Sequence, residues 1–256
     1  MIRDDVVIDK IGPLVYVVKR RLLTNGRSVS FDDVVCAWSL SLLSANCPNL
    51  KILNIKFGYK LYDDIQDLRN SLPDILRINS LEKLSFFHLR TEDDSFGIDY
   101  KENDTIKELK FEESALSGET LIHIATKSLH LEKLYVEGQT RDVYDWFLNI
   151  EFNEMVEILN ILSVYGTIKD LQILNCVYDN IDDTIEDIEN FFRSNLVPLI
   201  QAKFSNDCYI KIIYLQPDHT NLEDPEAGDL LVMLEKKVNR LEPQVTLHPY
   251  PSSVLY

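Results

Sequence analysis

The stretch Leu131-Glu132-Lys133-Leu134-Tyr135-Val136 decides the fold of this chain, because the same spacing recurs along most of its length. Its apolar residues stand at the first position and then three and five residues later, so the last two alternate as in a short strand. Six copies share the spacing: Leu50, Leu53, Ile55; Leu81, Leu84, Phe86; Ile106, Leu109, Phe111; Leu131, Leu134, Val136; Ile168, Leu171, Ile173; and Ile210, Ile213, Leu215. Their first positions are 31, 25, 25, 37 and 42 residues apart. Because a strand of about five residues cannot stand alone, the copies predict a stacked parallel sheet.

The segments between the copies are expected to supply helices, because parallel strands need a crossover connection. Apolar residues at helical spacing predict helices over 61–76, 118–129, 146–164 and 181–200. Three more helices are expected nearer the ends, over 13–25, from Ser30 onward, and over 225–241. The sequence therefore predicts the α/β class, with parallel strands inside and helices outside.

A family resemblance rests on three of the copies. The run Cys47-Pro48-Asn49-Leu50-Lys51-Ile52-Leu53-Asn54-Ile55 looks like the cysteine-containing leucine-rich repeat of F-box proteins, and residues 80–86 and 130–136 are similar to the same motif. The resemblance covers about residues 30–215 and implies an irregular leucine-rich-repeat solenoid, or horseshoe. It also implies a recognition module that passes a bound protein to ubiquitin ligation.

Two features depart from the family pattern. The family usually has Asn or Cys eight residues after the first Leu, where it bonds backbone groups of the turn. Only Cys176 matches here, and the other five positions hold Gly58, Leu89, Ser114, Gln139 and Asp218. Residues 1–45 also lack the Leu-Pro start and spaced apolar positions of an F-box. Either the chain lacks an F-box or Met1 is not the natural beginning of the functional unit, so a cullin adaptor is expected as a partner only if an F-box lies outside this chain.

Three segments are expected along the chain. Residues 1–30 form an amino-terminal flanking or truncated repeat, residues 31–221 the solenoid, and residues 222–256 a carboxy-terminal cap helix and tail. A stack of repeats needs such caps because its last repeats would otherwise expose their apolar sides.

Composition excludes several functions. The chain has 42 Asp and Glu against 26 Lys and Arg, a net charge of −16, which argues against a nucleic-acid partner. Apolar runs are far too short to span a bilayer, and the amino terminus lacks the order of a signal peptide. Four cysteines at scattered spacings fit reduced thiols in an intracellular protein, either cytoplasmic or nuclear.

Motifs for chemistry are absent from the sequence. Its five histidines form no His-x-x-x-His pair, and neither a Cys-x-x-Cys motif nor a glycine-rich phosphate loop occurs. We therefore expect no metal, no cofactor and no enzymatic activity.

What remains is a surface for a protein partner. Residues that flank the buried strand positions are expected to point onto the concave face, and none of these eighteen positions is an arginine that could serve a GTPase activator. The expected function is a protein–protein interaction module, and the resemblance implies substrate recognition in an F-box-type ubiquitin ligase; the alternative is a free-standing scaffold or inhibitor with no link to ubiquitin. The candidate protein-binding residues are Asn54, Lys83, Ser85, Phe87, Lys110, Lys133, Tyr135, Gln172 and Tyr214.

Overall fold

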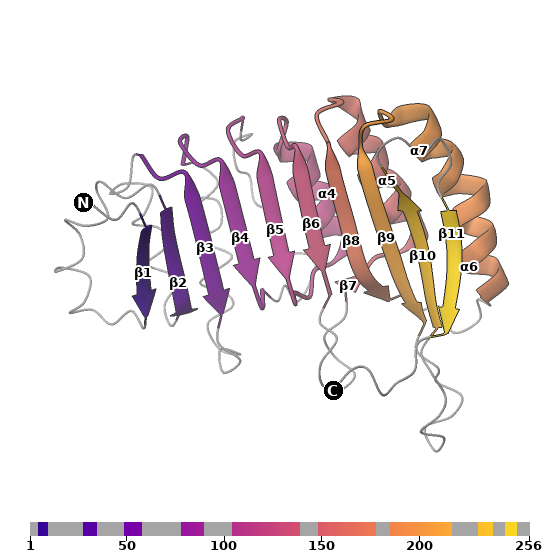
Figure 1. Ribbon diagram of the computed structural model, residues 1–256, viewed down its shortest axis with the longest axis horizontal. Coiled ribbons are helices and arrows are strands. Elements are labelled where there is room, and N and C mark those ends of the chain that lie inside the picture. The colour runs from indigo at the N-terminus through magenta and orange to yellow at the C-terminus, as the bar shows by residue number, and fades with distance from the viewer. Residues whose placement is uncertain are drawn as a thin grey trace, which may run out of the picture.

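A single sheet of eleven strands organises the described part of the chain. The computed structural model describes residues 5–9, 28–34, 49–57, 78–89, 104–138, 148–177, 185–216, 230–237 and 244–249. Figure 1 shows the strands side by side, with the helices packed behind them. The chain therefore has an α/β fold with a mostly parallel sheet.

Most strands follow one another in chain order. The parallel series is β1 (Asp5–Asp9), β2 (Ser28–Val34), β3 (Ile52–Phe57), β4 (Lys83–Phe87), β5 (Glu108–Glu112), β6 (Lys133–Glu137), β8 (Asp170–Val177) and β9 (Tyr209–Gln216). A two-residue strand, β7 (Leu148–Asn149), pairs with β8. The series ends in two antiparallel strands, β10 (Leu230–Lys236) and β11 (Gln244–Pro249).

The repeated apolar spacing forms the core, as the sequence predicts. Leu53, Leu84, Leu109, Leu134 and Leu171 stand in register across five strands, and Ile55, Phe86, Phe111, Val136 and Ile173 form the next row. The residues of both rows are buried, as are the first positions of these five copies. The strands predicted at these five copies are therefore confirmed, and the sixth copy also forms a strand, β9. Burial of each apolar side chain contributes about 1.5–3 kcal/mol.

The described helices lie between the later strands. They are α4 (Gly118–Lys127), α5 (Phe152–Val164), α6 (Ile185–Phe191), a π-helical segment (Phe192–Leu196) and α7 (Val197–Lys203). The helices predicted over 118–129 and 181–200 are confirmed. The one predicted from 146 begins at Phe152 instead, because Leu148 and Asn149 pair with β8. The helices predicted over 61–76 and 13–25 lie outside the described residues.

The helix start predicted at Ser30 and the helix predicted over 225–241 are wrong. Ser30 lies inside β2, whose Val29 and Phe31 pair in register with Leu53 and Ile55 of β3. The short capping signal at Ser30 is outweighed by this alternation. Residues 230–236 form β10 rather than part of a helix over 225–241, since a run of apolar residues there pairs with β9. The boundary expected after residue 30 also falls inside β2.

One carboxylate connects α4 to α5. Glu154 Oε2 accepts the backbone N–H of Glu151 at 2.7 Å, and the backbone of Glu119 bonds the same carboxylate. Burial raises the pKa of Glu154 above its ordinary value. A Cβ atom on Gly118 would lie 2.1 Å from Glu154 Oε2, so glycine leaves the space that this shared cap needs.

Candidate functional site

The side of the sheet that faces away from the helices is the candidate functional surface, here called the open face. Its side chains alternate with the buried rows and are all half-buried or exposed. Counted from the amino ends of the strands, the first row holds Ile52, Lys83, Glu108, Lys133, Asp170 and Tyr209; the second holds Asn54, Ser85, Lys110, Tyr135, Gln172 and Lys211; the third holds Lys56, Phe87, Glu112, Glu137 and Leu174.

Eight of the nine candidate residues lie on this face. Asn54, Lys83, Ser85, Phe87, Lys110, Lys133, Tyr135 and Gln172 occupy the three rows, so neighbouring strands bring them together.

Tyr214 is the exception, and its predicted exposure is wrong. Its side chain is 0% exposed, its hydroxyl donates to the carbonyl of Ile150 at 3.1 Å, and its ring lies edge-on to Phe152 and Phe192. Ile210 and Ile212, rather than Ile213 and Leu215, align with the core residues of β8, and an irregularity in the pairing follows them. A shift of one residue exchanges the two faces of a strand.

The same shift brings two residues onto the open face that the sequence analysis missed. Tyr209 and Lys211 flank Ile210 and pair with Asp170 and Gln172. The Tyr209 hydroxyl donates to Glu235 at 2.9 Å, and burial, together with this hydrogen bond, raises the pKa of Tyr209 to about 12. Alternation from Tyr209 to Ile212 was the signal that could have identified them.

Charges alternate in sign across the amino ends of the strands. In the first row, Lys83 Nζ lies 2.8 Å from Glu108 Oε2, and Lys133 and Asp170 continue the alternation. The residues just before the strands repeat it, in the order Lys51, Glu82, Lys107, Glu132 and Lys169. Hydrogen bonds from Lys51 and Lys169 lower the pKa values of Glu82 and Glu132, respectively. The first row and the residues just before the strands are thus each close to neutral in net charge, although the whole chain is acidic.

Tyr135 lies in the middle of the open face, where Lys110 contacts its ring and Glu137 bonds its hydroxyl. Lys110 Nζ lies 5.0 Å from the centre of its ring and also pairs with Glu112 at 2.7 Å. The Tyr135 hydroxyl donates to Glu137 at 2.8 Å. Burial and this carboxylate raise the pKa of Tyr135, so the hydroxyl stays protonated. These two contacts therefore fix the position of the ring.

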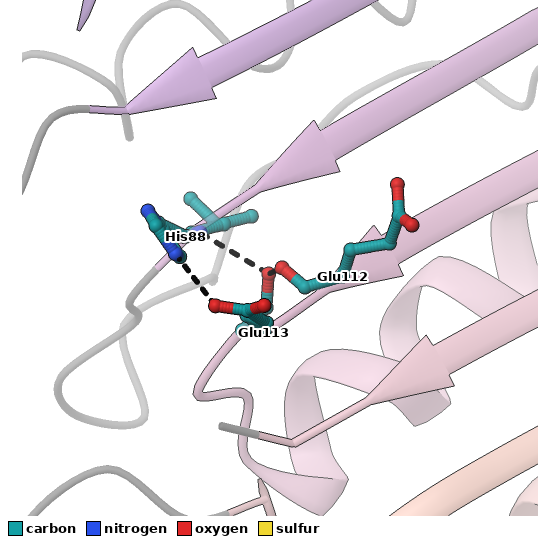
Figure 2. A network of polar contacts seen from close by, with 5 residues as sticks. His88, Glu112 and Glu113 are labelled. Carbon is teal, nitrogen blue, oxygen red and sulfur yellow. Dashed lines mark hydrogen bonds and ion pairs between the residues drawn. The ribbon is translucent and has the colours of Figure 1, made fainter. Parts of the chain in front are cut away.

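The carboxyl ends of β4 and β5 carry a strained polar pair. His88 and Glu113 have positive φ angles of 58° and 45°, a conformation that residues other than glycine rarely adopt. Figure 2 shows their side chains meeting, with His88 Nε2 2.9 Å from Glu113 Oε2, while the Glu112 side chain extends away. The His88 ring also contacts Phe87, and Lys56 Nζ lies 4.9 Å from the centre of the Phe87 ring. The turns thus fix the position of Phe87 in the third row.

Ser114 bonds the backbone of the turn that follows β5. Its buried hydroxyl accepts the backbone N–H of Leu89 at 3.1 Å and donates to the carbonyl of Glu112 at 2.8 Å. A serine at the eighth residue after the first apolar position can therefore bond the backbone of the turn, although the sequence analysis counted only Asn and Cys there.

Metal-ligating side chains and cysteines were the chemical groups that the sequence analysis considered. No group of three or more potential metal ligands occurs there. Cys176 and Cys208 are free and buried, and burial raises the pKa of Cys208 to about 11. No described helix is both long and apolar enough to cross a membrane.

No protein-family model matches the chain, and no curated protein matches it.

Proposed function

We propose that the chain is a protein-binding module of the leucine-rich-repeat type, which acts by binding and carries out no reaction itself. The observation that carries the proposal is Tyr135, a partly exposed tyrosine held in the middle of the open face by Lys110 and Glu137. Aromatic side chains at the centre of an interface supply much of the binding energy.

The fixed position of the Tyr135 ring supports a role in binding. An aromatic ring that is already ordered loses little conformational freedom when a partner covers it. The surrounding first row has alternating charges, with Lys83 and Glu108 already paired. Such charges contribute little affinity at an exposed surface but disfavour partners of the wrong charge pattern.

The assignment to leucine-rich repeats is supported by the turns as well as the strands. Each repeat from β3 to β8 begins with a buried apolar residue and continues into two buried strand positions. Side-chain hydroxyls of Ser80 and Thr167 donate to the first residues of the preceding repeats, Leu50 and Leu131, at 2.7 Å. These contacts join successive repeats in one direction, as in a solenoid.

A role in ubiquitin ligation rests on the F-box resemblance alone. It would place the chain inside the cell, in the cytoplasm or nucleus, and would require an F-box to reach the cullin adaptor. A free-standing scaffold or inhibitor would bind its partner in the same way without the adaptor. Detection of the cullin adaptor among co-purified proteins separates the two roles.

The test compares two tyrosine substitutions. Tyr135→Ala removes the ring on the open face, whereas Tyr165→Ala removes a 48% exposed tyrosine at the end of α5. Proteins captured on the wild-type chain should bind Tyr135→Ala weaker by about 2 kcal/mol or more. They should bind Tyr165→Ala as they bind wild type. Equal binding to all three forms, with circular dichroism confirming the fold, would contradict the proposal.

A further inference from the structure

The part of the third row that runs from β4 to β8 has two carboxylates with an apolar residue on each side, and Lys56 on β3 lies beyond Phe87 with its Nζ over the Phe87 ring. This part crosses four neighbouring strands in the order Phe87 on β4, Glu112 on β5, Glu137 on β6 and Leu174 on β8. All four side chains are partly exposed. From β4 to β8 the row is thus apolar, acidic, acidic and apolar, whereas charges of opposite sign alternate in the first row.

The two carboxylates are neighbours of like charge. The pairing of Phe111 with Val136 places Glu112 beside Glu137 at the next position. Like charges directly opposite each other on neighbouring strands disfavour the sheet. Lys110 pairs with Glu112, but the group bonded to Glu137 is the neutral hydroxyl of Tyr135. A cation from a partner, placed between the two carboxylates, would relieve the repulsion.

The dimensions of the row indicate how such a partner would lie. Phe87 and Leu174 are three strand spacings apart, or about 14 Å at about 4.8 Å each. In an extended chain, residues i and i+4 point to the same side and lie about 13 Å apart, with residue i+2 midway. In a helix, residues i and i+7 lie only about 10.5 Å apart, which is too short to reach both apolar ends.

We propose that the third row binds an extended segment of a protein partner that crosses the strands with the pattern apolar, any residue, Lys or Arg, any residue, apolar. The two apolar side chains contact Phe87 and Leu174, and the cation lies between Glu112 and Glu137. The net charge of −16 favours the approach of a basic segment. This inference rests on the proposed function, because it names the partner chemistry of the same face.

A peptide library tests the pattern while the natural partner is still unidentified. The full-length chain is used to select from an unbiased phage-displayed library of twelve-residue peptides. The selected peptides should share a basic residue with apolar residues two positions before and two positions after it. Selected peptides without this pattern, or no selection above background, would overturn the inference.

Synthetic peptides then locate the contact. The probe is leucine-serine-arginine-serine-leucine within a glycine-serine context, and its matched partner has glutamate in place of arginine. The arginine peptide should bind wild type about tenfold more tightly, from two exposed ion pairs. The double substitution Glu112→Gln and Glu137→Gln should remove this preference. Glu82→Gln with Glu132→Gln makes the same charge change at the amino ends of the strands and should retain it.

The outcomes separate this inference from the proposed function. Peptides that lose binding to Tyr135→Ala but lack the pattern would overturn the inference and leave the open face as the binding surface. Peptides that keep full binding to Tyr135→Ala and to the Glu112 and Glu137 double variant would count against both. An arginine preference that is lost equally in the control pair would show general attraction to an acidic chain and would overturn the inference alone.

Discussion

Substitutions of Tyr214 and Tyr135 should have different effects on the free energy of unfolding, because Tyr214 lies in the core and Tyr135 on the open face. Tyr214 is fully buried between Phe152 and Phe192, and its hydroxyl bonds the carbonyl of Ile150 just before α5. Tyr214→Ala should therefore lower the free energy of unfolding by about 3–5 kcal/mol, as expected for an aromatic side chain removed from a core. Tyr214→Phe retains the ring and should cost about 1 kcal/mol, because only the hydrogen bond is lost.

Tyr135→Ala should have a much smaller effect on stability. The substitution removes a partly exposed ring, with its contact to Lys110 and its hydrogen bond to Glu137. The loss of both should lower the free energy of unfolding by about 1 kcal/mol. Urea unfolding followed by circular dichroism measures all three variants, and an unchanged slope keeps the comparison valid. The reasoning is refuted if Tyr135→Ala destabilises the chain as much as Tyr214→Ala, or if Tyr214→Ala has no effect.

Three further predictions concern stability and reactivity. Gly118→Ala should displace the Glu154 carboxylate and cost about 2 kcal/mol for its two backbone hydrogen bonds; the same change in a Glu154→Ala background should cost less than about 0.5 kcal/mol, and equal costs in a double-mutant cycle would contradict the shared cap. Because Lys169 lowers the pKa of Glu132 in the folded chain, this pair should stabilise the fold above the ordinary value of 4.5 and lose its contribution as the pH falls through the lowered pKa; thermal unfolding of Glu132→Gln should show a weaker pH dependence over that range, and an identical profile would speak against the pair. Cys176 and Cys208 should resist iodoacetamide in the native chain, since burial raises both thiol pKa values; rapid alkylation of either, located by peptide mass spectrometry, would show that the core is open there.

The repeated strands could be predicted because each buried position is supported by its neighbours. Leu84, Leu109 and Leu134 occur at the same place in three successive repeats, and their register in the sheet follows directly. Eight of the nine candidate residues were placed on the open face by the same alternation. Periodicity over several repeats is a stronger signal than any single capping residue.

The ends of the chain were harder to predict because they offer only short, competing signals. Ser30 and the Asp224-Pro225 pair both suggest helix starts, but the neighbouring apolar residues pair with strands already present in the sheet. Tyr214 was misplaced for a different reason, since the irregularity between β8 and β9 has no marker in the local sequence. Tertiary pairing, rather than local propensity, decides both regions.

The central claim, that the open face receives the partner, is tested most directly by site-specific photocrosslinking. A photoreactive phenylalanine analogue placed at Ser85 lies on the open face, and one placed at Val164, 72% exposed, lies at the end of α5. With a partner captured on the wild-type chain, the account predicts a crosslinked product from position 85 and none from position 164. A product from position 164 alone would contradict it.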